Sequence, residues 1–289
     1  MKKSFKIFNK VISEYSSSLI IAEIGINHLG SEKLCREMIL SALQSGADCV
    51  KLQTVNVEES YLSNTDSYKA FEGKNFDKST LRRLSKFAIS NGGFLFSTPS
   101  DISSLELLES INISAYKVSS GLFTNIPLIE QIAVKNKPII LSVGMAKEEE
   151  IKNILEFLKK YKVDNFALLH CVSLYPAKYE QLNLNFIDKL KNTYKVITGY
   201  SDHSDGDLAC LAAISMGAKI IEKHFTIDRN LKGGDNYTSM EPNDFREMCI
   251  KIRNIEKMKY SNLEKPHKLE FNLRNIRYRN IFAKRDIKI

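Results

Sequence analysis

Two histidines at the ends of neighbouring apolar runs suggest a metal site. His203 follows the run 195–198, and His224 ends the run that begins at 219; both runs have the composition of β-strands. Between them, apolar residues recur at the spacing of one amphipathic helix. A strand–helix–strand crossover makes the strands parallel and about 4.8 Å apart, so the two imidazoles could emerge side by side and share a metal ion. The alternative is that each histidine is a satisfied structural group.

The same unit repeats along the chain and predicts the fold. Short apolar runs that predict strands lie at 19–22, 48–52, 93–96, 115–118, 138–141, 166–169, 195–198 and 219–222. Most are followed by helical periodicity, at 31–44, 79–90, 102–110, 126–135, 148–160, 185–191, 208–215 and 242–259. This alternation predicts an α/β protein with a parallel sheet. Eight units of this length favour a closed (β/α)8 TIM barrel over an open doubly wound sheet, and EIGINHLG lacks the dinucleotide-binding glycine spacing.

Segments outside the repeat are short. We expect a TIM-barrel catalytic domain over 1–259, in which 1–18 forms an N-terminal hairpin or cap. The segment 55–77 is expected to be a polar loop with several aromatic residues. Residues 260–289 are polar and rich in Lys, Arg and Asn, so they predict a C-terminal arm or linker.

Polar residues follow the predicted strands, where the catalytic groups of a barrel lie. They are Glu23, Asn27, His28, Lys51, Gln53, Ser97, Thr98, Lys117, Ser119, Ser120, Ser142, Ser173, Tyr175, Ser201, Asp202, His203, Glu222 and His224. Two lysines and several hydroxyls in one ring predict an anion site, because the ammonium groups supply charge and the hydroxyls donate to phosphate oxygens. Lys51 or Lys117 could instead be the Schiff-base nucleophile of an aldolase. A phosphorylated substrate and a metal account better for lysines beside two histidines.

Composition predicts a soluble, cytoplasmic protein. The chain carries five scattered cysteines, an odd number without a C-x-x-C pair, which indicates reduced thiols. No run has the length of a membrane span, and the basic start lacks the apolar core of a signal peptide. The net charge of +8 is spread over many lysines, which favours a solvated surface over a nucleic-acid partner. A positive field would also favour an anionic small substrate.

Several motifs together are more specific than any one of them. In chain order they are IAEIGINHLG, VKLQT, FSTP, AYKVSSG, ILSVGM, LLHCVSLYP, GYSDHS and IEKHFTID. In this order and at these intervals, over 19–242, they resemble the barrel domain of the sialic acid synthase (N-acetylneuraminate synthase) family. The resemblance implies a homodimeric enzyme that condenses phosphoenolpyruvate with an N-acylated hexosamine such as N-acetylmannosamine, releasing phosphate, for surface glycan biosynthesis. It also implies a divalent metal cofactor, Mn2+ or Mg2+.

Residue roles follow from the resemblance position by position. His203 and His224 would hold the metal, which makes the sugar aldehyde a better electrophile. The residues implied to bind phosphoenolpyruvate are Lys51, Thr98, Lys117, Ser120, Ser142, Ser173 and Ser201. Glu23, Glu222 and Asp235 match acidic positions near the reacting centre, where one could act as general acid or base. Gln53 and Tyr175 match sugar-facing positions.

The sequence also departs from the family pattern. Leu122 stands where the family usually has an acidic residue, Ser173 where some relatives have Asn, and Lys232-Gly233-Gly234 in place of Pro-Gly-Pro. The last residues resemble the linker to a small C-terminal antifreeze-like domain, which this sequence does not contain. The motif EIGINH favours the sialic or legionaminic branch. The alternatives are a legionaminic or pseudaminic acid synthase, or a catalytically impaired barrel that binds phosphoenolpyruvate.

Overall fold

Eight parallel strands form a closed barrel. The computed structural model describes residues 4–259, 267–279, 281 and 283–286. The barrel order is β10-β3-β4-β5-β6-β7-β8-β9. The strands are β3 (Leu19–Gly25), β4 (Cys49–Thr54), β5 (Leu95–Pro99), β6 (Tyr116–Val118), β7 (Ile139–Ser142), β8 (Phe166–Cys171), β9 (Ile197–Asp202) and β10 (Ile220–His224). The predicted (β/α)8 barrel is confirmed, and each predicted strand is present.

Burial on both faces explains why the strands are recognisable from sequence. All seven residues of β3 are buried, because helices cover the outside of the barrel and side chains fill its interior. Several strands run further than expected at their C-terminal ends. The prediction ended β4 at Leu52 and β9 at Thr198, whereas the structure extends them to Thr54 and Asp202. Of the polar residues in these extensions, Gln53 and Ser201 line a cavity, whereas Asp202 forms an ion pair with Lys223.

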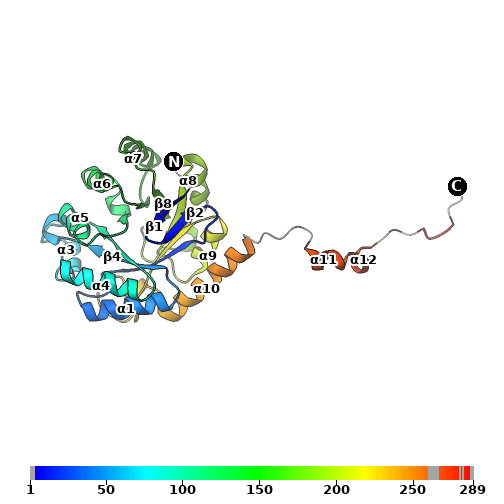
Figure 1. Ribbon diagram of the computed structural model, residues 1–289, viewed down its shortest axis with the longest axis horizontal. Coiled ribbons are helices and arrows are strands. Elements are labelled where there is room, and N and C mark those ends of the chain that lie inside the picture. The colour runs from blue at the N-terminus through cyan, green and yellow to red at the C-terminus, as the bar shows by residue number, and fades with distance from the viewer. Residues whose placement is uncertain (1–3, 260–266, 280, 282, 287–289) are drawn as a thin grey trace.

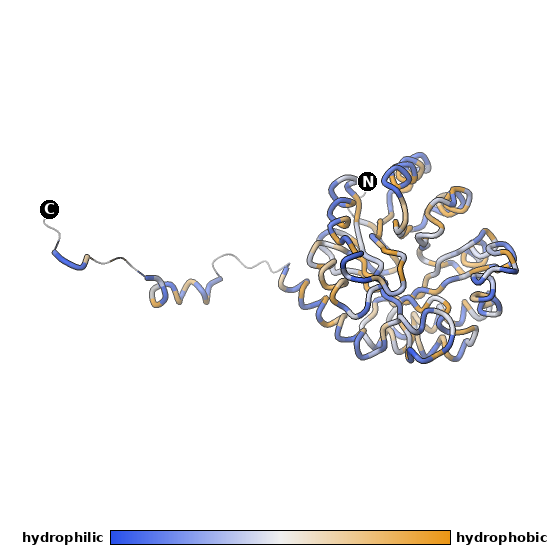
Figure 2. The backbone as a smooth tube through the Cα atoms, turned by 180° about the vertical axis from the view of Figure 1, so that it is seen from behind, coloured by the Kyte–Doolittle hydropathy of each residue, from blue (hydrophilic) through white to orange (hydrophobic). Residues whose placement is uncertain are grey.

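Helices surround the strands on the outside (Figure 1). They are α1 (Glu32–Gln44), α4 (Lys78–Ser90), α5 (Ile102–Glu109), α6 (Ile126–Ala133), α7 (Glu148–Lys160), α8 (Asn185–Tyr194), α9 (Leu208–Ser215) and α10 (Pro242–Lys259). In α7, Ile151, Ile154 and Leu158 form the buried stripe, and acidic and basic residues occupy the first and last turns, where they complement the helix dipole. Figure 2 shows hydrophilic and hydrophobic residues alternating along these helices.

The prediction of a loop at 55–77 is wrong, because the segment contains two short helices. They are α2 (Val57–Ser60) and α3 (Asp66–Phe71). Asn56 and Thr65 cap them by accepting hydrogen bonds from the backbone N–H groups of Glu58 and Tyr68. Helices of one or two turns bury too few residues to leave a periodic apolar pattern. The capping residues Asn56 and Thr65 are therefore the only sequence features that indicate them.

The predicted N-terminal hairpin is present. Strands β1 (Ser4–Ile7) and β2 (Lys10–Ser13) pair antiparallel. Lys10 forms an ion pair with Asp48, which directly precedes β4, and the Phe8 ring lies 5.4 Å from that of Phe94, just before β5. The hairpin therefore covers the N-terminal end of the barrel, opposite the end at which barrel enzymes hold substrates.

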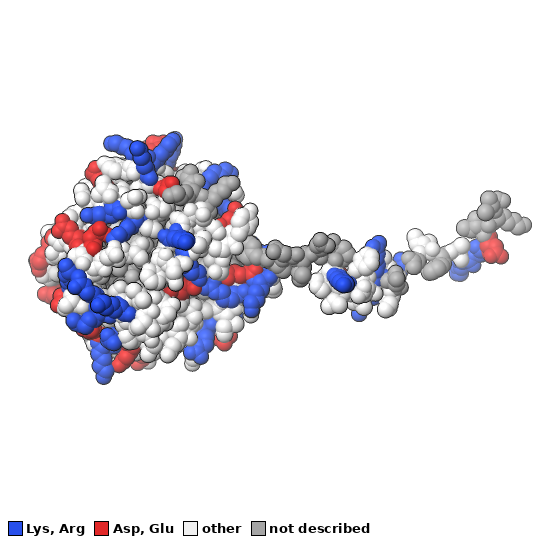
Figure 3. Space-filling view, in the orientation of Figure 1, with Lys and Arg blue, Asp and Glu red and all other residues white. Residues whose placement is uncertain are grey.

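The predicted C-terminal arm lies partly outside the described residues, at 260–266, 280, 282 and 287–289. Within it, α11 (Lys268–Asn272) and α12 (Arg274–Arg277) lie apart from the barrel (Figure 1). On the face shown in Figure 3, Lys and Arg side chains are interspersed with Asp and Glu. None of the helices in the described part of the chain combines the length and the hydropathy that a membrane crossing requires.

Candidate active site

One cavity of about 660 Å³ opens at the C-terminal ends of the barrel strands. The residues to which the family resemblance gives a role all line it: Glu23, Lys51, Gln53, Thr98, Lys117, Ser120, Ser142, Ser173, Tyr175, Ser201, His203, Glu222, His224 and Asp235. The structure therefore brings together residues from all eight strands and their following loops, as the barrel topology requires.

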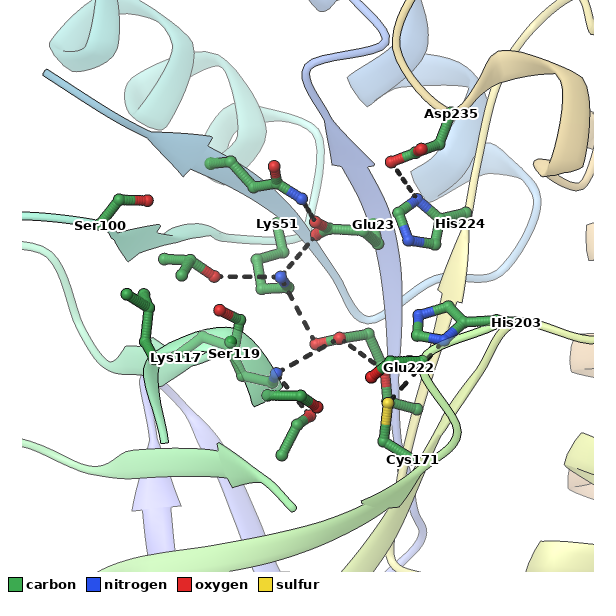
Figure 4. A pocket seen from close by; sticks show the side chains of 18 of the residues that line it. Glu23, Lys51, Ser100, Lys117, Ser119, Cys171, His203, Glu222, His224 and Asp235 are labelled. Atoms are coloured by element: carbon green, nitrogen blue, oxygen red, sulfur yellow. Dashed lines mark hydrogen bonds and ion pairs between the residues drawn. The ribbon is translucent and has the colours of Figure 1, made fainter. Parts of the chain in front are cut away.

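Two lysines and two glutamates form a buried ionic network at the base of the cavity (Figure 4). The Lys51 ammonium lies 2.9 Å from a carboxylate oxygen of Glu23 and 3.7 Å from one of Glu222. The Lys117 ammonium lies 3.5 Å from the other oxygen of Glu222. Glu222 therefore lies between both lysines, and each positive charge has a negative neighbour, as buried charges require.

Strand register explains why Glu23, Lys51 and Glu222 point into the same space. Glu23 pairs with Lys51 across β3 and β4, and Glu222 pairs with Ser201 across β9 and β10. Residues paired across neighbouring strands point to the same face of the sheet, here the barrel interior. The Ser201 hydroxyl donates to Glu222 over 3.0 Å, and the Gln53 amide donates to Glu23 over 2.9 Å.

The network sets different proton affinities for its members. Burial opposes ionisation of Glu222, but Lys117 and Lys51 outweigh it and lower the pKa of Glu222 to about 2. Burial raises the pKa of Glu23 despite the opposing effect of Lys51. Burial and the neighbouring charge of Lys51 lower the pKa of Lys117, although Glu222 acts in the opposite direction. Glu222 is thus a fixed negative charge, whereas Glu23 is the carboxyl better suited to hold a proton.

The pKa of Lys51 is shifted in the opposite direction to that of Lys117. Burial acts to lower its pKa, but the two carboxylates of Glu222 and Glu23 outweigh burial and raise it. A Schiff-base nucleophile must be a neutral amine, so the raised pKa disfavours Lys51 in the aldolase role considered above.

Hydroxyl groups surround the two ammonium groups. Lys51 donates to Thr98 over 3.1 Å, and Lys117 donates to Ser142 over 2.7 Å. The backbone N–H of Gly144 donates to the Ser120 hydroxyl over 3.1 Å. A Cβ atom at position 144 would lie only 2.6 Å from the Ser120 oxygen and 2.7 Å from that of Ser173, so glycine permits this close approach. Charged donors ringed by hydroxyls can bind an anion with several oxygens.

The two predicted histidines lie side by side, as expected from consecutive strand ends. Their ring centroids are 5.5 Å apart. The His203 Nδ1–H donates to the carbonyl of Val172 over 2.7 Å, and its Nε2 lies within hydrogen-bond distance, 3.0 Å, of the Tyr175 hydroxyl. Burial and the nearby charges of His203 and Lys51 hold the pKa of His224 well below its ordinary value, so this ring is neutral.

These residues offer metal-ligand atoms without forming a complete ligand cluster. Within the described residues, no group of three or more His, Cys, Asp or Glu side chains is placed to hold a metal ion. Nevertheless His224 Nδ1 is buried and has no hydrogen-bond partner among the described residues, and an Asp235 carboxylate oxygen lies 3.7 Å from it. Neutral imidazoles and a carboxylate are suitable ligands for a divalent ion. The donor set therefore fits a metal between the histidines and the cavity.

Four residues that follow predicted strands do not line the cavity. Asn27 donates from its amide to the Phe225 carbonyl over 2.9 Å, and His28 stacks on Phe76. The Ser97 hydroxyl donates to the Leu52 carbonyl over 2.9 Å. Asp202 forms a buried ion pair of 2.6 Å with Lys223. They are structural because they point into the loops or into the layer between barrel and helices, a direction that residue type does not reveal.

Other cavity residues were not identified from the sequence. The Cys171 thiol lies 3.8 Å from His203 Nδ1, and Figure 4 places it beside that ring. Burial opposes its ionisation, but His203 and Lys117 outweigh burial and lower the pKa of Cys171. The other unanticipated lining residues are Ser60, Tyr61, Phe71, Ser100, Gly121 and Met145. The position of Cys171 at the end of a predicted strand could have indicated that it lines the cavity. No local sequence pattern indicates this for Tyr61 and Phe71.

Comparison with known proteins agrees with this geometry. The model of the NeuB family matches residues 38–263. This chain belongs to the NeuB family. It is 38% identical to N,N'-diacetyllegionaminic acid synthase of Campylobacter jejuni, over 94% of this chain and 86% of that protein. It is 33% identical to human N-acetylneuraminate-9-phosphate synthase, over 82% of this chain and 70% of that protein.

A solved structure supports the same assignment. The N-acetylneuraminic acid (sialic acid) synthetase of Leptospira borgpetersenii, crystallised with citrate, superposes with a TM-score of 0.89 at 34% identity, covering 95% of this chain and 97% of that one. The sequence-based resemblance to sialic acid synthases is thereby confirmed. The NeuB-family chain is a nonulosonic acid synthase in its general function, an enzyme class that condenses phosphoenolpyruvate with a sugar.

Proposed function

We propose that this NeuB-family enzyme condenses phosphoenolpyruvate with an N-acylated hexosamine and releases inorganic phosphate. The observation that supports the proposal is the pair of buried lysines, ringed by hydroxyls, in one cavity with two adjacent histidines. The first group suits a phosphorylated, carboxylated substrate, and the second suits activation of an aldehyde. A barrel that used only one of these two substrates would need either the lysine–hydroxyl group or the histidine pair, but not both.

Phosphoenolpyruvate is proposed to bind over the lysine network. Lys51 and Lys117 supply charge to the phosphate and carboxylate, and the hydroxyls that they already contact, Thr98 and Ser142, hold their ammonium groups in position. Ser120, Ser173 and Ser201 are proposed to donate to the remaining oxygens. Because Glu222 keeps a negative charge between the lysines, it stabilises both ammonium groups when no substrate is bound.

The metal proposed at His203 and His224 would, when bound, act as a Lewis acid toward the sugar aldehyde oxygen. Two imidazoles with the nearby Asp235 carboxylate suit a transition-metal ion such as Mn2+ better than Mg2+, which prefers oxygen ligands and retains water. Tyr175 orients the His203 ring through the hydrogen bond to Nε2 in the metal-free protein. Gln53, which contacts Glu23, is proposed to face the sugar.

Proton transfer is proposed to involve Glu23 or Asp235. The new bond joins the methylene carbon of phosphoenolpyruvate to the aldehyde carbon; water then adds to the neighbouring carbon, and phosphate leaves. Burial raises the pKa of Glu23 and also that of Asp235, which brings both nearer to the range where a general acid or base works well. Glu222, with its pKa held at about 2, is proposed to act by charge alone.

The experiment is a phosphate-release assay with purified protein. With Mn2+ present, release from phosphoenolpyruvate should require an N-acylated hexosamine, and the product mass should equal that of the sugar plus a pyruvate unit. Release that ignores the sugar, or no release with any such sugar, would contradict the proposal. Stabilisation of the fold by phosphoenolpyruvate without turnover would instead identify the impaired binding barrel. A homodimeric assembly and a cytoplasmic location are parts of the proposal that rest on the family alone.

A further inference from the structure

A second cavity, of about 560 Å³, lies at the N-terminal end of the barrel, opposite the candidate active site. The hairpin segment, the C-terminal end of α8 and the starts of β9 and β10 contribute its lining residues, and we call it the hairpin cavity. None of the described residues lines both this cavity and the candidate active site. Its volume falls in the range of small-molecule sites, so it has room for an organic ligand and not only for an ion.

Three lysines line the hairpin cavity from different elements. Lys191 lies in the last turn of α8, Lys195 directly follows that helix, and Lys219 directly precedes β10. Lys219 is 4% exposed, and its backbone is held between two strands. Its N–H donates to the Thr198 carbonyl over 2.8 Å, and its carbonyl accepts from the Leu19 N–H over 2.9 Å. A rigid part of the barrel therefore positions this lysine.

A fourth ammonium group reaches the edge of the hairpin cavity. Gly217 lines the cavity, and a Cβ atom at this position would lie 3.8 Å from Lys259 Nζ and 4.0 Å from Lys191 Nζ. Lys259 is fixed there, because its ammonium group donates to the Ser215 carbonyl over 2.8 Å at the end of α9. Two cations, one from α8 and one from α10, thus approach the same point of the cavity wall.

The acidic residues that line the hairpin cavity do not balance its lysines. Glu14 is the one acidic residue among the described lining residues, and it pairs with Lys191 over 2.6 Å. Burial lowers the pKa of Lys219, and the charges of Lys259 and Lys191 add to this effect against the opposing carboxylates of Glu256 and Glu14. The fold therefore disfavours the charged form of Lys219, and an anion bound in the cavity would counteract this effect.

Apolar side chains complete the lining of the hairpin cavity. Val11, in β2, is 41% exposed, and Tyr15, shortly after this strand, is 82% exposed. Val196 and Ile197 line the cavity at the start of β9. An exposed tyrosine ring can stack on a flat ring of a ligand. The cavity therefore offers both positive charge and apolar contact to one molecule.

We propose that the hairpin cavity binds a small organic phosphate such as a nucleoside monophosphate. The phosphate lies among Lys191, Lys195 and Lys219, and the ring of the ligand lies against Tyr15 and Val11. A phosphate monoester carries almost two negative charges and three oxygens, so it matches several ammonium groups better than a single carboxylate does. The inference does not rest on the proposed function, because this cavity lies at the other end of the barrel from the proposed reaction.

Three compounds that share parts of one structure test this inference. They are AMP, ribose 5-phosphate, which lacks the base, and adenosine, which lacks the phosphate. Each is titrated into the full chain by calorimetry, without metal or sugar. We expect AMP to bind about 10-fold more tightly than either of the others, because ribose 5-phosphate loses the stacking contact and adenosine loses the charged hydrogen bonds.

Variants locate the binding. Lys195 has a left-handed backbone conformation, with φ 54°, so Lys195→Gly removes the ammonium group without straining the chain. Lys162→Gly is the matched control, because Lys162 also follows a helix, has φ 57° and lines neither cavity. We expect Lys195→Gly to raise the Kd for AMP by about three- to five-fold and Lys219→Met to raise it by on the order of 10-fold, whereas Lys162→Gly leaves it unchanged.

The outcomes separate the ligand class from its location. AMP that binds no more tightly than ribose 5-phosphate and adenosine would overturn the ligand class. Equal Kd values for AMP in Lys195→Gly and Lys162→Gly would overturn the assignment to the hairpin cavity. AMP binding that is weakened by Lys117→Met, in the candidate active site, but not by Lys195→Gly would overturn it as well. If Lys219→Met does not fold, Lys195→Gly still decides, because Lys195 is exposed.

Failure of the proposed function is distinguishable from failure of this inference. A chain that releases no phosphate from phosphoenolpyruvate with any N-acylated hexosamine, but binds AMP in the expected order, would refute only the proposed function.

Discussion

Lys117 and Lys223 form a natural comparison between a lysine in the proposed substrate site and one outside it. Both are 2% exposed and near strand ends, and each has a carboxylate neighbour: Glu222 at 3.5 Å for Lys117, Asp202 at 2.6 Å for Lys223. Lys117 lines the cavity, whereas Lys223 does not. We predict that Lys117→Met impairs phosphoenolpyruvate binding and that Lys223→Met impairs only stability.

The magnitude follows from the contacts. A hydrogen bond to a charged group contributes about 1.5–3 kcal/mol, so Lys117→Met should raise the KM for phosphoenolpyruvate by about 10- to 150-fold. Stability should change less, because Glu222 keeps Lys51 at 3.7 Å and the Ser201 hydroxyl at 3.0 Å. Lys223→Met leaves a buried carboxylate without its cation, which costs about 3–5 kcal/mol of unfolding free energy.

The assay is phosphate release at saturating sugar and varied phosphoenolpyruvate, with urea unfolding measured on the same preparations. Lys223→Met should keep the parent KM within about two-fold where the protein is folded, since one tenfold change requires about 1.4 kcal/mol of differential binding. A Lys117→Met protein that folds like the parent and keeps its KM for phosphoenolpyruvate would refute the lysine assignment. Thermal stabilisation by phosphoenolpyruvate gives the same test if turnover is lost.

Three further predictions concern pH, packing and the metal. Burial lowers the pKa of His28 to about 4. Below about pH 6.5 this histidine is therefore protonated in the unfolded chain but still neutral in the folded one, so the free energy of unfolding falls as the pH is lowered toward 4. Between pH 8 and pH 5 this effect should lower the free energy of unfolding by about 2 kcal/mol. In urea unfolding, His28→Gln should remove this contribution to the dependence of the unfolding free energy on pH. An unchanged pH dependence would contradict the assignment to His28. A Cβ at Gly199 would lie 2.5 Å from the Ile220 carbonyl oxygen, so Gly199→Ala should destabilise by about 1–3 kcal/mol, while Gly121→Ala, with open space around it, should not; similar melting curves would contradict this. His203→Ala and His224→Ala should each weaken Mn2+ binding in a calorimetric titration with circular dichroism unchanged, and affinities equal to the parent would exclude a shared site.

The sequence by itself determined the barrel and most of its site. Strands such as β3 are buried on both faces, so they must be apolar throughout, and helices such as α7 must repeat their apolar residues at helical spacing. Because parallel strands all end at one side of a barrel, polar residues after each strand could be assigned to one mouth without knowing any distance. That reasoning placed His203 next to His224 correctly.

Only the tertiary structure decided which polar residues face the cavity and what completes its mouth. Lys117 and Lys223 both occur near strand ends, but the pleat turns one toward the substrate site and the other toward the helices. Asn27 and His28 follow a strand but turn into loop packing. Tyr61 reaches Phe71 only because two short helices fold the segment after β4 back on itself. Side-chain direction and loop path depend on contacts between distant segments, and no local pattern records them.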